Sequence, residues 1–125
     1  MMKQTLTIPG QLPTLNETIN DCKRHWSLYH AKKKKFTTLI SLAVSHLKPI
    51  EGQVHLSFRW FTQDKRTDPD NIAAGGRKVI LDGLVKGGIL PGDSFGHIAS
   101  FSDVFAIDRG NPRVEVEIAR ASRRK

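Results

Sequence analysis

The chain lacks the features that mark several large classes of protein. It has a single cysteine, Cys22, which cannot form an internal disulfide and cannot by itself build a structural zinc site. No apolar run approaches the roughly 18 residues that a membrane span needs. The opening residues MMKQTLTIPG lack the apolar core of a secretory signal. We therefore expect a cytoplasmic protein in a reducing setting, with no membrane partner.

Acidic residues are also scarce: 12 Asp and Glu stand against 20 Lys and Arg, which leaves a net charge of +8. This balance favours a polyanionic partner, most often nucleic acid, sometimes an anionic membrane surface. Two groups of basic residues stand out, one early in the chain and one at its end. The early group contains Lys23, Arg24, Lys32, Lys33, Lys34 and Lys35; the tail contains Arg120, Arg123, Arg124 and Lys125. The early group is either a phosphate-binding surface or a solvated helical turn, and we expect the tail at 120–125 to be disordered unless a partner holds it.

Hydrophobic periodicity predicts one α+β domain over residues 1–125, in the order β-α-β-α-β-β, with a small mixed sheet packed by two helices. Predicted strands lie at QTLTIP, QVHLSFRWF, about 98–107 and 113–119. Predicted helices run up to about Leu47 and from Asp70 or Asn71 to Lys86, the second ending at Gly87-Gly88. The residues expected in the core are every second residue of the second strand and every third or fourth residue of the first helix. They comprise Val54, Leu56, Phe58 and Trp60, and Phe36, Leu39, Ile40, Ala43, Val44 and Leu47.

The stretch KRTDPDNIAAGGRKVILDGL gathers acids within this basic chain. Pro69 restricts Asp68 to an extended backbone, and if Asp70 is also extended the two carboxylates point to the same side. One of Asp70 and Asn71 can be explained as a helix N-cap, but capping does not explain Asp68 as well.

The helix that follows carries a polar stripe. Asn71, Gly75, Lys78 and Asp82 lie on one face, opposite a core face formed by Ile72, Val79, Ile80 and Leu84. Gly75 and Gly76 each cost about 0.5–1 kcal/mol relative to alanine inside a helix. Either a helix, a subunit or a nucleic-acid backbone packs closely there, or the helix starts irregularly.

Several carboxylates without a His or Cys cluster suit a hard divalent cation such as Mg²⁺, which takes one or two carboxylates plus substrate phosphates. A nearby lysine would add positive charge where a phosphoryl group accumulates negative charge. The acid cluster, the lysine and the basic surface together indicate phosphodiester hydrolysis. We interpret Trp26, Trp60 and the phenylalanines as core residues rather than base-stacking platforms.

With these motifs the sequence resembles the RusA family of Holliday-junction resolvases, small endonucleases common in prophages. The likeness covers nearly the whole chain, through LTIPGQLPTLNE, the basic first helix, DPDN, LDGL and GGILPGDSF. It implies a homodimer that nicks four-way DNA junctions in recombination and repair, using Mg²⁺, with Mn²⁺ as a substitute. By resemblance Asp68, Asp70 and Asp93 are the catalytic metal ligands, with Asp82 and Asn71 as additional site residues.

The chain departs from this family at its lysine. Family members with the shorter motif carry a catalytic lysine four residues after the second aspartate, where this chain has Ala74, and AAGG adds about one helical turn. Lys78 is our candidate for the catalytic lysine, with Lys65, Arg66 and Arg77 as substitutes and further DNA contacts. The alternatives are a non-catalytic basic DNA-binding protein of phage origin and, last, an enzyme acting on another phosphate substrate such as a nucleotide.

Overall fold

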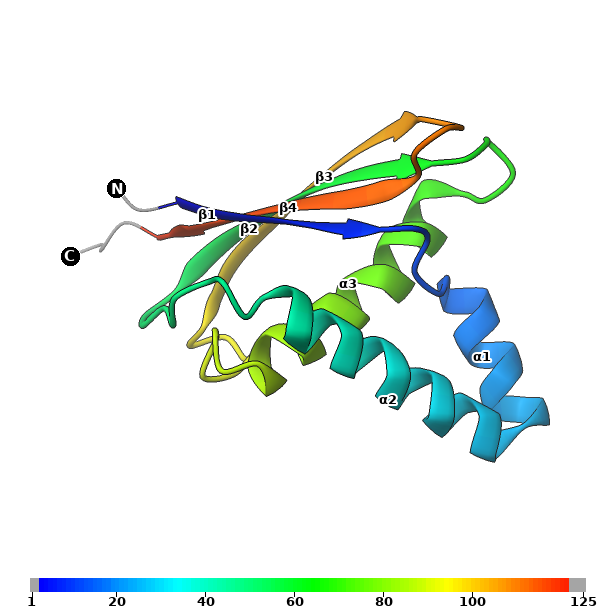
Figure 1. Ribbon diagram of the computed structural model, residues 1–125, viewed down its shortest axis with the longest axis horizontal. Helices are drawn as coiled ribbons and strands as arrows, with labels where there is room; N and C mark the ends of the chain where they lie inside the picture. Colours follow the sequence, from blue (N-terminus) through cyan, green and yellow to red (C-terminus); the bar gives the residue numbers. More distant parts are fainter. Residues whose placement is uncertain (1–2, 122–125) are drawn as a thin grey trace.

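The computed structural model describes residues 3–121, and this part of the chain folds into four strands and three helices (Figure 1). The elements in chain order are β1 (Lys3–Pro9), α1 (Leu15–Arg24), α2 (Trp26–Ala43), β2 (Val54–Thr62), α3 (Pro69–Lys86), β3 (Ile98–Ile107) and β4 (Arg113–Arg120). The predicted α+β class is confirmed, and the predicted strands match to within two residues. The predicted tail residues from 122 onward lie outside the described part, whereas Arg120 ends β4.

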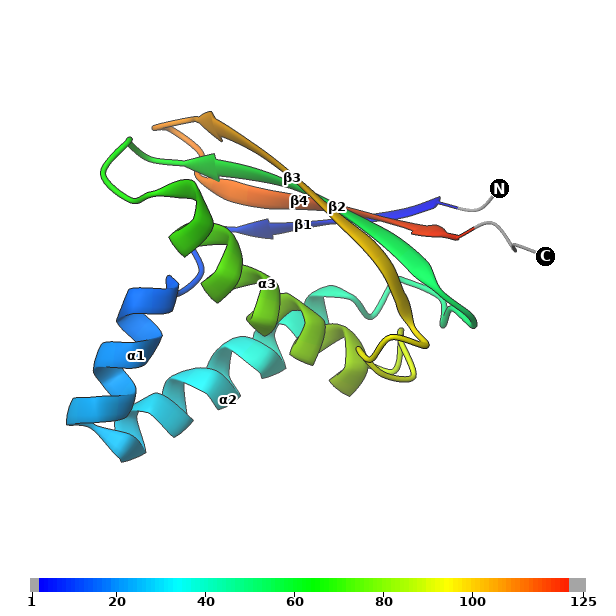
Figure 2. The same ribbon diagram turned by 180° about the vertical axis from the view of Figure 1, so that it is seen from behind.

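The sheet is mixed, as expected, with the strand order β1-β4-β2-β3. β4 pairs antiparallel with β1 on one side and with β2 on the other, while β2 and β3 run parallel. Parallel neighbours need a long crossover, and α3 provides it. Figures 1 and 2 show all three helices on the same face of the sheet, so the domain has two layers, and no helix of residues 3–121 covers the other sheet face.

The core lies between the sheet and the helices. Val54, Leu56, Phe58 and Trp60 of β2 are all buried, which confirms the alternation predicted for this strand. Ile80 and Leu84 of α3 are fully buried in the same core, together with Ile40 of α2 and Val44, the residue after the end of α2. The prediction for the first helix is wrong at Leu39, which is 47% exposed and lies beside the buried stripe rather than in it.

The single long helix predicted before Leu47 is two helices, and this corrects the predicted count of two helices to three. Thr14 begins α1 with a capping box, accepting from the Glu17 amide while the Glu17 carboxylate accepts from the Thr14 amide. His25 ends it, because its backbone leaves the helical region (φ −142°, ψ 80°). No Gly or Pro marks the break, so periodicity alone runs through it.

The glycine pair of α3 is explained by packing within the chain. A Cβ added to Gly75 would overlap backbone atoms of Pro13, Thr14 and Leu15, the segment that leads into α1. A Cβ added to Gly76 would lie 2.6 Å from Cζ3 of Trp60 in β2. Of the alternatives left open by the sequence, close packing is therefore the one observed, against the start of α1 and against the Trp60 side chain of β2. These two glycines let α3 touch the sheet and the start of α1 at once.

Within residues 3–121, none of the helices combines the length and the apolar character that crossing a bilayer requires.

Candidate functional site

Two exposed carboxylates stand at the N-terminus of α3. Asp68 occupies the N-cap position, which corrects the expectation that Asp70 or Asn71 would cap this helix. Its backbone is extended (φ −66°, ψ 143°), as expected for a residue before proline. Its carbonyl accepts from the amides of Asn71 and Ile72, but its side chain makes no capping hydrogen bond. Asp70 already lies in the first helical turn, so the condition that both acids are extended is not met. The Asp68 carboxylate is thus exposed and not used for capping.

Asn71 has a structural partner. Its Oδ1 accepts from the backbone amide of Asn16 at 2.9 Å, which satisfies a free amide in the first turn of α1. This bond joins the start of α3 to the start of α1 beside Gly75. We therefore assign Asn71 a positioning role between the two helices.

A second polar group lies farther along α3. The Lys78 ammonium is 3.4 Å from Oδ1 of Asp82 and 3.7 Å from Oδ2 of Asp93. Asp93 is carried by the turn after α3, and that turn is anchored by the buried side chains of Ile89 and Leu90. The Lys78 side chain remains 64% exposed, so solvent or a ligand can still reach it.

The predicted metal ligands do not lie together within one chain. Twelve residues separate Asp70 from Asp82, so the two ends of the polar face are about 18 Å apart along the helix axis. Asp93 lies at the far end, beside Lys78 and Asp82. Within residues 3–121, no three His, Cys, Asp or Glu side chains form a group that could hold a metal ion. One chain therefore presents two separate acidic groups: Asp68 with Asp70, and Asp82 with Asp93.

Arg77, expected to contact DNA, is engaged inside the protein. Its Nη2 donates to Oδ2 of Asp103 at 2.5 Å, and Asp103 also accepts from the Trp60 indole at 2.8 Å. The guanidinium lies 4.7 Å from the centre of the Phe101 ring, and its side chain is only 26% exposed. Arg77 thus joins α3 to β3 through this ion pair, and its contact with DNA stays a prediction.

The lysine run of α2 faces two ways. Lys32 turns toward α1 and bonds to Asp21 at 2.8 Å, so it is the lysine that the sequence expected to lean toward the protein. The hydrogen bond to Asp21 raises the pKa of Lys32 above its ordinary value. The other expected DNA contacts are exposed. They are Lys23, Arg24, Lys33, Lys34, Lys35, Lys65 and Arg66.

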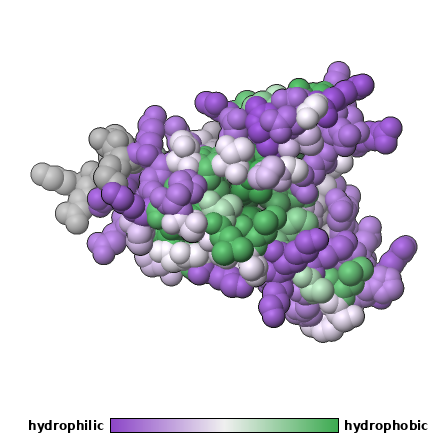
Figure 3. Space-filling view, viewed as in Figure 1, coloured by the Kyte–Doolittle hydropathy of each residue, from purple (hydrophilic) through white to green (hydrophobic). Residues whose placement is uncertain are grey.

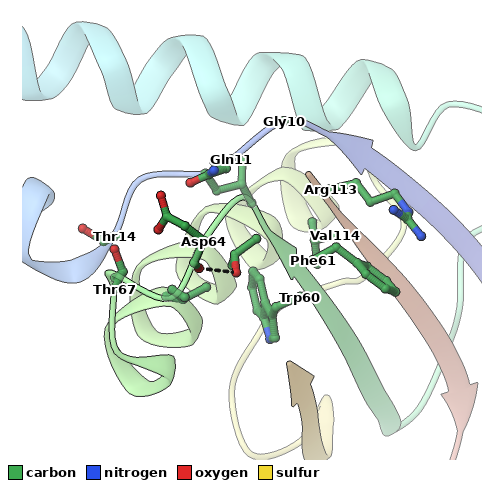
Figure 4. A pocket seen from close by; sticks show the side chains of 12 residues that line it. Gly10, Gln11, Thr14, Trp60, Phe61, Asp64, Thr67, Arg113 and Val114 are labelled. Carbon is green, nitrogen blue, oxygen red and sulfur yellow. Dashed lines mark hydrogen bonds between the residues drawn. The ribbon is translucent and has the colours of Figure 1, made fainter. Parts of the chain in front are cut away.

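Two hollows near these residues differ in size and lining. A cavity of about 310 Å³ lies between the three helices, with Leu15, Tyr29, Phe36 and Val79 among its apolar walls and Lys32, Lys33, Lys78, Asp21 and Asp82 among its charged ones. The other, drawn in Figure 4, is lined by residues such as Gln11, Trp60 and Asp64 and holds only about 40 Å³, room for a water or two. The dashed line in Figure 4 marks the hydrogen bond that the Thr62 hydroxyl donates to the Asp64 carbonyl at 3.0 Å. This bond stabilises the start of the loop that leads to Asp68.

The prediction that the aromatic residues belong to the core is right for Trp60 and Phe58 and wrong for Trp26 and Phe95. Trp26 begins α2, is 65% exposed, and meets the His30 ring edge-on at 4.3 Å. Hydropathy could not reveal that Trp26 is exposed. The exposure depends on the break at His25, which directs α1 away from the start of α2. Figure 3 shows an apolar area near the centre of the face seen in Figure 1, surrounded by hydrophilic side chains.

No model of a known protein family matches the chain, and no curated protein sequence shows significant similarity to it.

Proposed function

We propose that this protein is a Mg²⁺-dependent, structure-selective DNA endonuclease that hydrolyses phosphodiester bonds at four-way junctions. The observation that carries the proposal is the pair Asp68 and Asp70: two exposed carboxylates one residue apart, the first at an N-cap position yet making no cap bond. Ordinary capping leaves Asp68 unexplained, whereas metal binding uses both acids.

The donor set fits Mg²⁺. Oxygen ligands suit this ion, which is commonly held by one or two carboxylates while substrate phosphates and waters complete its shell. Asp68 and Asp70 would hold it, and Lys65 and Arg66 in the preceding loop are exposed and able to attract the DNA backbone. The ion would supply an activated water and stabilise the leaving oxygen; Mn²⁺ has the same ligand preference and is the expected substitute.

A homodimer suits both the substrate and the separation of the acidic groups. A four-way junction is approximately two-fold symmetric, and two equivalent sites match it. In a two-fold dimer with antiparallel α3 helices, the Asp93 end of one copy would approach the Asp68 end of the other. Lys78 would then bring its positive charge toward the scissile phosphate.

The basic side chains exposed on α1, on α2 and in the loop before α3 would contact phosphates. Such contacts position the DNA without reading its sequence, so we expect preference for shape over sequence. Each neutralised phosphate steepens the salt dependence of the binding constant by about 0.9 in logarithmic slope for B-DNA. Replacing Lys34 with Ala should reduce that slope by about one unit per protomer, if its ammonium contacts one phosphate.

The test is cleavage of a synthetic four-way junction with and without Mg²⁺. We expect paired nicks with Mg²⁺ and none with excess chelator. Asp70→Asn should lose cleavage by at least about 100-fold while junction affinity is retained, because one ligand oxygen and one negative charge are lost. Glu51→Gln, at an exposed position outside the site, is the matched control and should cleave like the wild type. Equal cleavage by Asp70→Asn and the wild type would refute the metal role of this acid.

A non-catalytic DNA-binding protein is the second candidate, and the separation of Asp93 from Asp68 in one chain favours it. Both candidates require salt-sensitive DNA binding. Only the non-catalytic candidate predicts that preparations which bind junctions tightly cleave no branched substrate, with or without Mg²⁺ or Mn²⁺. The same assay therefore separates the two.

A further inference from the structure

Strand β3 has one unpaired edge. It pairs with β2 on one side, and no strand among residues 3–121 occupies its other side, since β3 ends the sheet order. Ten residues of extended chain run for roughly 33 Å. Along this length the outward amides and carbonyls form a template that another strand can pair with.

Apolar side chains stand on both faces of this edge. Asp103 points to the helix side, where it bonds to Trp60, and Phe101 and Phe105 share that side because strand side chains repeat every second residue. Val104, 59% exposed, points to the opposite side. Phe101, Phe105 and Ile107 are each between 37% and 44% exposed. An edge strand that is apolar on both faces is unusual in a protein that stays monomeric.

The edge also lacks the devices that normally prevent pairing. β3 contains no Lys, Arg or Pro, and its single charge, Asp103, is neutralised by Arg77. The opposite edge, β1, is shorter and carries an exposed lysine, Lys3, together with Pro9. Lysine and proline at an edge are common protections against strand addition. Of the two edges of this sheet, β1 is protected and β3 is not.

Charge argues for a second copy of the same chain as the occupant of this edge. Although the protein carries 20 Lys and Arg, none lies between residues 87 and 108, the segment that contains β3. Two molecules of net charge +8 repel each other over most of their surface. At β3 they can meet without apposing basic groups, and each supplies the unpaired backbone that the other needs.

We propose that two copies of the chain associate through antiparallel pairing of β3 with β3. A two-fold axis can relate adjacent antiparallel strands only when it runs perpendicular to the sheet, so one eight-stranded sheet would carry the helices of both copies on the same face. A register centred on Asp103 is disfavoured because it places the two Asp103 residues opposite each other. This inference identifies the surface of the dimer on which the proposed function rests, and it requires neither DNA nor metal.

The test is the mass of the purified chain in solution, by sedimentation or light scattering, without DNA or Mg²⁺. We expect about twice 14.0 kDa, that is about 28 kDa, for the wild type. Val104→Lys places two ammonium groups in the new strand pair and removes an apolar contact, so dissociation should become about 100-fold easier. Leu42→Lys is the matched control, since Leu42 is an apolar α2 residue that is 67% exposed, and it should remain dimeric.

Amide hydrogen exchange tests whether the variant is correctly folded. Val104→Lys should keep slow exchange in β2 and β4 and show faster exchange in β3 alone. A wild type of 14 kDa at all concentrations would overturn the inference, and so would a Val104→Lys protein as dimeric as the wild type. Asp70→Asn separates the two proposals, because it should form the dimer yet fail to cleave. Its cleavage result bears on the proposed function, and its mass bears on the interface.

Discussion

Gly75 gives the sharpest test of how α3 is positioned, because two opposing effects act at that residue. Replacing a glycine by alanine inside a helix is ordinarily stabilising by about 0.8–1 kcal/mol. At Gly75 the new methyl group would overlap backbone atoms of Pro13, Thr14 and Leu15. Backbone cannot rotate away as the end of a flexible side chain can, so the overlap should cost about 2–3 kcal/mol, in the upper range for overpacking.

The net expectation for Gly75→Ala is therefore a loss of about 1–2 kcal/mol in the free energy of unfolding. For a chain of 125 residues the entropy of unfolding is about 0.26 kcal/mol/K, so the Tm should fall by about 4–8 °C. The assay is thermal and urea unfolding followed by circular dichroism. Gly110→Ala is the control, because no atom lies within 4 Å of a Cβ added there and its backbone is not left-handed. It should change the Tm by no more than about 2 °C. An equal or higher Tm for Gly75→Ala would refute the close packing of α3 on the segment before α1.

Three further predictions concern Trp26, Lys32 and Arg77. Trp26→Ala should weaken junction binding by about 1–3 kcal/mol if the exposed indole stacks on a base, with thermal stability unchanged; undiminished affinity in a titration would exclude that contact. Lys32 should react with acetic anhydride more slowly than Lys33–Lys35, since its raised pKa leaves less of the reactive neutral amine at any given pH. The Lys32 side of the pair stays charged at neutral pH and loses its proton as the pH rises through that raised pKa. Mass spectrometry of the labelled peptides measures this, and equal rates would contradict it. Arg77→Ala should lower stability by about 1–3 kcal/mol because Asp103 loses its charged partner, whereas a phosphate-binding arginine would alter DNA affinity and leave urea unfolding unaffected.

Most of the fold follows from local patterns. The alternation of β2 and the turn residues after α3 need no tertiary information to predict, because side-chain periodicity and the conformational freedom of glycine are properties of the chain itself. Gly88 illustrates this: its φ of +79° follows the end of α3, where the sequence placed the turn. The break at His25 was missed because the residues around it are compatible with helix, and the angle between α1 and α2 is decided by packing onto α3.

The candidate site was predictable in part. The acid pair Asp68 and Asp70 could be recognised because Pro69 restricts the backbone around it, and a lysine one turn before Asp82 could be expected to pair with it. Arg77 could not be assigned, since a partly exposed arginine on a helix has the same sequence pattern whether its partner is a phosphate or Asp103. The ion pair depends on β3 lying beside β2, a pairing between segments more than 40 residues apart.

The sequence alone therefore determined which chemical groups this protein has: a basic chain, the acid pair on either side of Pro69, and a lysine and two further aspartates in and after the helix that follows. Tertiary structure decided how these groups are distributed. A straight helix keeps residues twelve positions apart at opposite ends, so α3 separates Asp70 from Asp82, and the turn that follows brings Asp93 to the far end. It also decided which edge of the sheet is left without a partner. Pairing between distant strands sets that edge, and no local propensity encodes it.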